Sequence, residues 1–249
     1  MRIARVSVDG RASTAIVKGR RVHLVGGTIW KPGEETGEDF PMSAVRFLPP
    51  TAPSKIVAIG VNYLSHAGER RAPSEAQPFL KAPSSLIGAG DAIIAPGDSE
   101  NLHAEAEVVA VISKRARHLD ESEVDAHVLG YTAGNDVSER DWQQADLQWW
   151  RAKSSDTFTA VGPWIDTSLK PEKIAVAGLI NGREQQSSDT SLLIHSIRTC
   201  IARISRYMTL ERGDLVFTGT PGTTGRIVAG DVCEVKVGSM VLRNPVEAG

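Results

Sequence analysis

Hydrophobic and polar residues alternate in short runs along the first part of this chain. Residues 4–8 and 21–25 follow this pattern, and turn signals that end at Gly10 and Gly19 separate them. A period of two is typical of strands with one buried face, and short glycine-containing breaks favour hairpin turns. We therefore predict a small β-rich domain over residues 1–48.

A proline-rich stretch at residues 49–53 marks the start of a second, larger domain, residues 49–249. Strands are expected at 56–60, 86–88, 92–98, 104–113, 128–135, 174–181, 184–186, 215–217 and 232–237. The clearest helical spacing of apolar residues covers residues 191–209. Strands dominate, so we predict a mainly β fold with a mixed sheet or rolled barrel at its centre.

Composition narrows the class of protein. Of the 249 residues, 41% are hydrophobic and 23% charged, which is ordinary for a globular domain. The net charge of −2 argues against a nucleic-acid or anionic membrane partner. Apolar runs such as residues 108–112 are far shorter than the roughly 20 residues of a membrane span, and the N-terminus lacks the apolar core of a signal peptide. Cys200 and Cys233 form no CxxC pair, so we expect buried free thiols in a cytoplasmic protein.

Two acidic residues fall on one face of the strand predicted at 104–113. Side chains alternate along a strand, so Glu105 and Glu107 lie about 7 Å apart on the same face, while the opposite face is wholly apolar. Two buried carboxylates repel each other, and a divalent cation removes that cost. Oxygen ligands suit Mg²⁺ or Mn²⁺, or Ca²⁺ at a looser site. The alternative is a strand end that emerges into solvent with both glutamates solvated.

Asp136 is the candidate third ligand. It follows the strand predicted at 128–135 and precedes a polar turn, which places it at the end of a sheet. The alternative interpretation is that Asp136 caps the next turn or helix, as aspartate often does.

His66 and Glu69 are candidates for acid–base chemistry. They are three residues apart, so on a helical turn their side chains face one another, and the glutamate could hold the imidazole in one tautomer while it activates water. The alternative is a solvated ion pair on the surface.

Two further segments could contact an anionic substrate. Lys153 follows two tryptophans and could be a desolvated cation, although an exposed lysine is the simpler interpretation. The Gly/Thr-rich loop at residues 218–225 could bring backbone N–H groups close to a carboxylate, but it is no Walker A loop and could be a plain turn.

The order of these motifs resembles that of the fumarylacetoacetate hydrolase family over roughly residues 54–246. The matching segments are Gly-x-Asn-Tyr-x-x-His-x-x-Glu at 60–69, Phe-Leu-Lys-Ala-Pro-Ser-Ser at 79–85, Asn-Leu-His-x-Glu-x-Glu at 101–107, Asn-Asp-Val-Ser-x-Arg-Asp-x-Gln at 135–143, Lys-Ser-x-Asp-Thr-Phe at 153–158, Gly-Pro at 162–163 and Thr-Gly-Thr-Pro at 218–221. Val61 departs from the pattern, since close relatives often have arginine there. The stretch 222–225, Gly-Thr-Thr-Gly, departs from a more usual Gly-Val-Gly.

The resemblance implies the family's mixed β-sandwich roll, often dimeric, with Mg²⁺ or Mn²⁺ at its mouth. It implies metal binding by three carboxylates, an active-site lysine, a water-activating pair as in acylpyruvate hydrolases, and a substrate pocket. The residues in these roles would be Glu105, Glu107 and Asp136 for the metal, Lys153, the pair His66 and Glu69, and Lys81, Gln143, Gly219 and Thr220 for the pocket.

The function expected first is therefore hydrolysis of a C–C bond in a small 2,4-dioxo acid of the acylpyruvate type, through a metal-stabilised enolate. The same enolate also serves an isomerase of the 2-hydroxyhepta-2,4-diene-1,7-dioate type or a decarboxylase of the oxaloacetate type, and by resemblance the setting would be catabolism of aromatic compounds. A metal-binding protein without catalysis is the alternative from another class. It is disfavoured because every ligand, the lysine and the pair are present.

Overall fold

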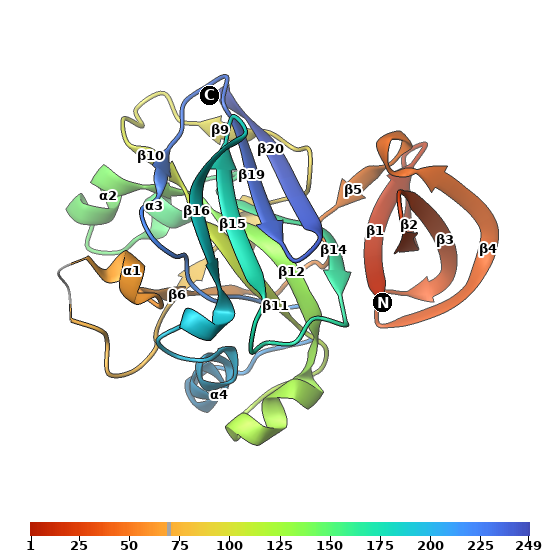
Figure 1. The fold of residues 1–249 in the computed structure, drawn as a ribbon, viewed down its shortest axis with the longest axis horizontal. Helices are drawn as coiled ribbons and strands as arrows, with labels where there is room; N and C mark the ends of the chain where they lie inside the picture. The colour runs from red at the N-terminus through yellow and green to blue at the C-terminus, as the bar shows by residue number, and fades with distance from the viewer. Residues whose placement is uncertain (69–70) are drawn as a thin grey trace.

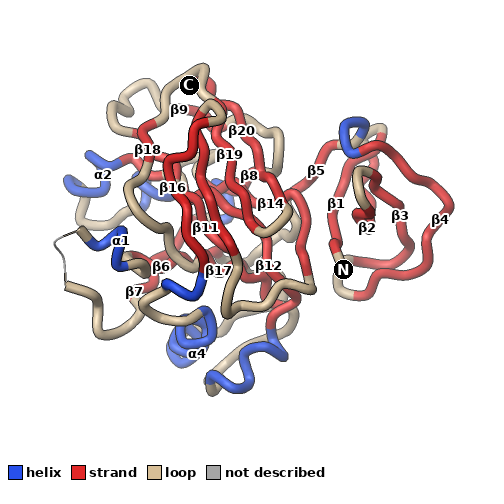
Figure 2. Tube along the Cα trace, viewed as in Figure 1, coloured by secondary structure: helices blue, strands red, loops and turns tan. Residues whose placement is uncertain are grey.

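The computed structural model describes residues 1–68 and 71–249, and it confirms that the chain is mainly β. Strands form three sheets, and helices lie at their edges (Figure 2). No helix in the described part of the chain is both long and apolar enough to cross a membrane.

The first five strands form a curled sheet at one side of the molecule (Figure 1). They are β1 (Arg2–Val8), β2 (Arg11–Lys18), β3 (Arg21–Thr28), β4 (Lys31–Pro41) and β5 (Arg46–Leu48). The predicted hairpin turn between β1 and β2 is present, with φ of 48° at Asp9 and 80° at Gly10. Strand β1 also pairs with β14, where Ile3 lies opposite Ile165. The pairing of β1 with β14 joins the two predicted domains in one sheet. The domain boundary after residue 48 therefore stays a prediction.

The same sheet continues into the larger part of the chain in the order β1-β14-β12-β11-β17-β6-β7, with β8 paired to β14. These strands are β6 (Ile56–Gly60), β7 (Gln77–Lys81), β8 (Leu86–Ile87), β11 (Ala106–Ile112), β12 (Val128–Asp136), β14 (Thr159–Asp166) and β17 (Leu215–Phe217). Strands β11 and β12 lie at its centre and are buried along most of their length.

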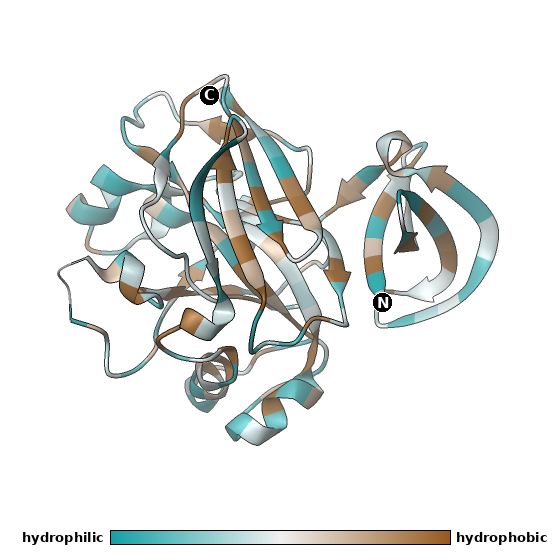
Figure 3. Ribbon diagram, viewed as in Figure 1, coloured by the Kyte–Doolittle hydropathy of each residue, from teal (hydrophilic) through white to brown (hydrophobic). Residues whose placement is uncertain are grey.

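A second sheet, in the order β16-β15-β19-β20-β9, packs on this one. Its strands are β9 (Ile93–Ala95), β15 (Ala175–Ile180), β16 (Arg183–Asp189), β19 (Val232–Val237) and β20 (Met240–Ala248). The predicted apolar face of β11 is confirmed, because Ala106, Val108 and Ala110 pack in one core with Val235 and Leu242. Edge strand β16 is mostly hydrophilic, in contrast to the strands beside it (Figure 3).

The prediction of one continuous strand over 104–113 is wrong, and the difference shapes the site. The chain breaks at Glu105, whose backbone N–H donates to the Asn135 side-chain Oδ1 (2.9 Å) and so leaves the regular ladder. The strand before the break joins a third, small sheet in the order β13-β10-β18. Its strands are β10 (Leu102–Ala104), β13 (Ser138–Glu139) and β18 (Gly225–Arg226).

The helices are short. They are α1 (Leu64–Ala67), α2 (Arg140–Ala145), α3 (Trp150–Ser154) and α4 (Ile197–Tyr207), with 3-10 turns at Met42–Ala44, Pro83–Ser85, Glu121–His127 and Thr190–Leu192. The helix predicted at 191–209 is shorter than expected, because the Ser196 hydroxyl accepts from the Thr199 N–H (3.1 Å) and starts α4 there. Cys200 and Cys233 are free and buried, and burial raises the pKa of each thiol to about 12.

Candidate metal centre

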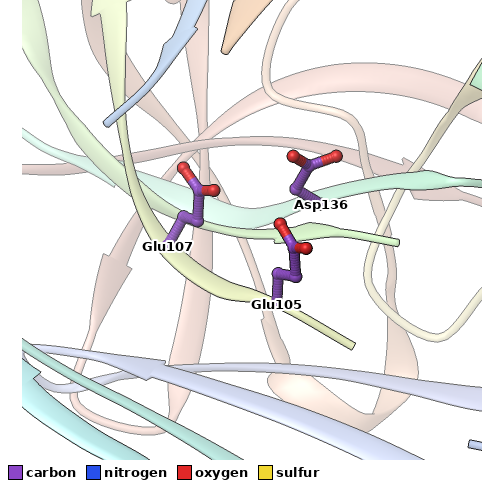
Figure 4. A group of neighbouring side chains, drawn as sticks. All are labelled: Glu105, Glu107 and Asp136. Carbon is purple, nitrogen blue, oxygen red and sulfur yellow. The ribbon is translucent and has the colours of Figure 1, made fainter. Parts of the chain in front are cut away.

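The three predicted carboxylates come together at one end of the central sheet. Glu105 lies at the break between β10 and β11, Glu107 lies in β11, and Asp136 ends the neighbouring strand β12. One ligand oxygen from each lies within 4.8 Å of the others, and the side chains converge in Figure 4. Their exposed fractions are 3%, 1% and 1%. The alternative of two solvated glutamates at a strand end is therefore wrong.

Backbone pairing sets this convergence. Strands β11 and β12 run antiparallel with Glu107 opposite Gly134. Asp136, the last residue of β12, therefore lies beside Glu105. The Asp136 N–H donates to the Glu105 carbonyl (3.0 Å). The helix cap after this strand is Glu139, whose carboxylate accepts from the Trp142 N–H (2.7 Å). Asp136 is therefore not the cap of α2, and its side chain is left for the cluster.

Three cations face these carboxylates. Lys153 in α3 donates to Glu105 Oε2 (2.9 Å) and to Asp136 Oδ2 (2.7 Å). Lys81, at the end of β7, forms an ion pair with Asp136 Oδ1 (2.5 Å). Both lysines are buried, so the simpler interpretation of Lys153 as an exposed lysine is wrong. Arg140, at the start of α2, places Nη2 2.6 Å from Glu105 Oε1.

The electrostatics of the three carboxylates differ. Burial would raise the pKa of Glu105, but Lys153 and then Arg140 outweigh it and hold that pKa well below its usual value. Burial, with Asp136 and Glu105 nearby, holds the pKa of Glu107 well above its usual value. Among the residues that the structure describes, cations form ion pairs with Glu105 and Asp136 but not with Glu107.

The lysines differ as well. Burial lowers the pKa of Lys81 and outweighs the attraction of Asp136. For Lys153 burial acts in the same direction, but Asp136 and Glu105 outweigh it and raise the pKa. Lys153 is therefore the more firmly charged of the two.

These residues fit a divalent cation. Glu107 makes no ion pair with any residue that the structure describes; its Oε2 accepts a hydrogen bond from the Gly219 N–H (2.6 Å). Asp136 Oδ1 has the ion pair to Lys81 but no well-directed hydrogen bond in the described part of the chain. A cation between the three side chains would stabilise ionised Glu107. An all-oxygen donor set suits Mg²⁺ or Mn²⁺, with Ca²⁺ as a substitute.

His66 lies in the single turn of α1, and its ring orientation is fixed by the backbone. Its Nδ1 lies 2.7 Å from the Gly222 carbonyl oxygen. A carbonyl only accepts hydrogen bonds, so Nδ1 carries the proton and Nε2 of the neutral ring is the basic atom. Charge on His66 is the smallest of the named causes that lower the pKa of Glu105. Glu69 lies outside the described residues, and its role as partner of His66 stays a prediction.

The Gly/Thr-rich loop is a structural support of the centre. Gly219 has φ of 106°, and a Cβ there would lie 2.7 Å from the Asn62 Cβ, so only glycine fits. The Thr220 hydroxyl donates to the Ala106 carbonyl (3.0 Å) and accepts from Gln186 Nε2 (2.8 Å). Substrate contacts by Gly219 and Thr220 stay predictions.

Two residues of the site were missed in the sequence. Arg140 belongs to the Asn-Asp-Val-Ser-x-Arg motif, which was the available signal, and its Nη1 donates to Gln143 Oε1 (2.9 Å). The sequence signal for Gln186 was the strand predicted at 184–186, which gave no indication of its role in the site. It accepts from the Ala106 N–H (2.9 Å) and donates to the Pro221 carbonyl (2.6 Å). The predicted substrate contact of Gln143 stays a prediction, as does that of Lys81.

The chain belongs to the fumarylacetoacetate hydrolase family. Residues 55–247 match the family model described as fumarylacetoacetate (FAA) hydrolase C-terminal, and residues 1–50 match the model described as Rv2993c-like, N-terminal. The resemblance drawn from the motifs is thereby confirmed.

Relatives with sequence similarity support this assignment. An uncharacterised protein of Archaeoglobus fulgidus is 42% identical over 211 residues, which cover 84% of each chain. The mitochondrial oxaloacetate tautomerase Fahd2a of Rattus norvegicus is 38% identical over 193 residues, which cover 75% of this chain and 62% of the relative.

Solved structures share the whole fold. The 5-carboxymethyl-2-hydroxymuconate delta-isomerase of Mycobacterium smegmatis superposes with a TM-score of 0.92 at 36% identity, covering 100% of both chains. The maleylpyruvate hydrolase of Sphingobium sp. SYK-6, solved with manganese(II) and pyruvate, superposes with a TM-score of 0.84 at 25% identity, again over 100% of both chains. The predicted mainly β roll with a β-rich N-terminal region is confirmed.

Proposed function

We propose that this protein is a divalent-metal-dependent isomerase that interconverts the keto and enol forms of small 2-oxo dicarboxylic acids, with oxaloacetate as the simplest substrate. The observation that carries the proposal is the buried cluster of three carboxylates facing three cations. The rat tautomerase and the mycobacterial isomerase support it, because both names describe proton shifts in acids of this kind.

The charge of the cluster favours a dianionic substrate. With a divalent cation bound, Glu107 is stabilised in its ionised form, and the three carboxylates Glu105, Glu107 and Asp136 then carry three negative charges. When protonated, Lys81, Lys153 and Arg140 carry three positive charges, which balance them. A divalent cation leaves two positive charges in a largely buried site. Uncompensated buried charge is costly, and a dicarboxylate supplies the matching two negative charges.

Each residue of the site has a distinct role in the proposed enolisation. A divalent ion held by Glu105, Glu107 and Asp136 would act as a Lewis acid toward the 2-oxo acid. His66 Nε2 accepts the proton that leaves C3. The electron pair of that C–H bond forms the C2=C3 double bond, and the π pair of the C2 carbonyl moves onto its oxygen. Lys153 adds positive charge beside that oxygen. Protonation of the oxygen gives the enol, and the reverse steps restore the ketone.

The test follows the ketonisation of enol-oxaloacetate by its absorbance, with metal-loaded protein. We expect the wild-type protein to accelerate the reaction and His66→Asn to lose about 100-fold of that acceleration, which is typical of removing a general base. His118→Asn is the matched control, since His118 is exposed and has φ of 52°, which asparagine tolerates. Equal rates for His66→Asn and the wild type would overturn the role of His66.

Hydrolysis of an acylpyruvate is the second candidate. The observation that favours it is the tautomer of His66, whose basic Nε2 could activate water as readily as it accepts a proton from carbon. Pyruvate release from acetylpyruvate, measured beside enol-oxaloacetate ketonisation, separates the two. Faster turnover of acetylpyruvate would make hydrolysis the main activity. Decarboxylation of oxaloacetate needs no base, so His66→Asn should spare it.

We also propose a homodimer with aromatic catabolism as its setting, as the family resemblance implies, and a cytoplasmic location, as expected from the two buried free thiols. Light scattering of the purified protein tests the first part. A measured mass equal to that of a single chain would overturn the proposed homodimer.

A further inference from the structure

The small third sheet gathers three segments beside the centre. His103 in β10 lies opposite Ser138 of β13 on one side and Arg226 of β18 on the other. Thr224 immediately precedes β18, and Arg140 immediately follows β13. This pairing brings the side chains of His103, Thr224 and Arg140, which are far apart in the sequence, into contact.

A chain of hydrogen bonds with a fixed direction runs through them. Asn101 Nδ2 donates to Asp141 Oδ1 (2.9 Å), so Asn101 Oδ1 is an acceptor and His103 Nε2 donates to it (2.9 Å). In the neutral ring His103 Nδ1 is then an acceptor, and the Thr224 hydroxyl donates to it (2.8 Å). The Thr224 oxygen in turn accepts from Arg140 Nη2 (2.8 Å).

This chain fixes the Arg140 guanidinium. Its Nη2 donates to the Thr224 hydroxyl (2.8 Å) and forms an ion pair with Glu105 Oε1 (2.6 Å). Its Nη1 donates to Gln143 (2.9 Å). Two of the five N–H donors of a guanidinium have no partner within the part of the chain that the structure describes, and the side chain is 18% exposed. Those donors are available to a carboxylate that enters the site.

We propose that Thr224, supported by His103, is a positioning residue that holds Arg140 as the contact for the second carboxylate of a 2-oxo dicarboxylate. The inference rests on the proposed function and deepens it by naming how a diacid is distinguished from a monoacid. Without the Thr224 hydroxyl, Arg140 loses one of three anchors and His103 loses its donor. The loss affects binding of the second carboxylate more than proton transfer at C3.

The experiment compares three variants with two keto acids that differ by one group. Oxaloacetate carries a carboxylate where 2-oxobutyrate carries a methyl group. Thr224→Val keeps the shape and removes the hydroxyl, Thr224→Ser keeps the hydroxyl, and Thr223→Val is the matched control, because Thr223 is exposed. We expect Thr224→Val to raise KM for oxaloacetate about tenfold with kcat within about twofold, the effect of one charge-assisted hydrogen bond. Thr224→Ser and Thr223→Val should match the wild type, and inhibition by 2-oxobutyrate should stay unchanged.

Other results overturn the inference. An equal weakening of oxaloacetate and 2-oxobutyrate in Thr224→Val, or a loss of kcat and thermal stability without a change in KM, would show a merely structural role for Thr224. If the wild type does not act on oxaloacetate at all, the proposed function fails, and calorimetry of the two keto acids with Mg²⁺-loaded protein still decides the inference. A preference for oxaloacetate that Thr224→Val abolishes supports it; no preference in the wild type, or one that Thr224→Val keeps, overturns it.

Discussion

At the scale of single residues, the three buried carboxylates of the metal centre differ in how far nearby cations balance their charge. Glu105 and Asp136 are each paired with cations, whereas Glu107 receives one backbone hydrogen bond. The sequence pattern identified all three carboxylates: alternation along a strand predicted Glu105 and Glu107 on one face, and the end of the next predicted strand pointed to Asp136. It did not identify Arg140, since the contact between Arg140 and Glu105 depends on a pairing of segments 35 positions apart in the chain.

Lys153 offers a prediction at this scale. Its ammonium bridges Glu105 and Asp136 inside the protein, so Lys153→Met leaves both carboxylates short of a donor and removes positive charge from the reacting oxygen. We expect kcat for enol-oxaloacetate ketonisation to fall about 100-fold, in line with the loss of one stabilising donor. Lys170→Met is the control, because Lys170 is exposed. An unchanged kcat in Lys153→Met would contradict the role given to this lysine.

At the scale of elements, strands with clear alternation were predicted well and their interruptions were not. Strands β6, β17 and β19 have the predicted bounds. The break at Glu105 was missed, because the acceptor that takes its N–H is the side chain of Asn135, thirty residues away. A local pattern contains no information on such a partner. The break is nevertheless what separates β10 from β11 and allows β10 to pair in the third sheet.

Gln186 of β16 gives the prediction for this scale. Its buried amide connects Ala106 at the start of β11 to Thr220 and Pro221 in the Gly/Thr-rich loop. Gln186→Leu leaves those backbone groups unpaired, which costs about 2 kcal/mol of the free energy of unfolding. We expect the midpoint of thermal unfolding to fall by about 6 °C. Gln185→Leu, at an exposed neighbouring position, should leave it within about 1 °C, and an equal effect of both would refute the assignment.

At the scale of the whole molecule, the layers follow from contacts between distant parts of the chain. The pairing of β1 with β14, and the packing of β19 in the second sheet on β11 in the central one, join segments more than a hundred residues apart in sequence. Periodicity predicted that strands dominate, but not their order, because strand order depends on which faces fit together. The resemblance of the motifs supplied the type of fold, and the comparisons confirmed it.

Asp214 tests the connection between such distant segments. Its buried carboxylate precedes β17 and accepts from the N–H groups of Ser54 (2.9 Å), Lys55 (3.0 Å) and Glu211 (2.7 Å), and from the Lys55 ammonium (2.6 Å). Burial would raise the pKa of Asp214, but Lys55 and these hydrogen bonds outweigh it and hold that pKa below its usual value. The carboxylate therefore stabilises the fold above the pKa of unfolded aspartate, near 4, and this stability is lost as the pH falls through the lower folded pKa.

We expect Asp214→Asn to lower the midpoint of thermal unfolding by about 5 °C at pH 7, equivalent to about 2 kcal/mol. The difference from the wild type should shrink as the pH falls below about 4, because the carboxylate is protonated first in the unfolded chain and then, at lower pH, in the folded protein. Asp98→Asn, at an exposed position, is the matched control. A difference for Asp214→Asn that stays constant between pH 7 and pH 3 would contradict this account.

The central claim is that Glu105, Glu107 and Asp136 hold the divalent ion on which enolisation depends. The most direct measurement is the rate of enol-oxaloacetate ketonisation by metal-stripped protein as Mg²⁺ or Mn²⁺ is added, for the wild type, for Glu107→Gln and for the exposed control Glu247→Gln. The account predicts a rate that rises to a plateau with metal in the wild type and in Glu247→Gln, and a rate that stays near the uncatalysed value in Glu107→Gln. A full rate without metal, or the same metal response in Glu107→Gln as in the wild type, would contradict it.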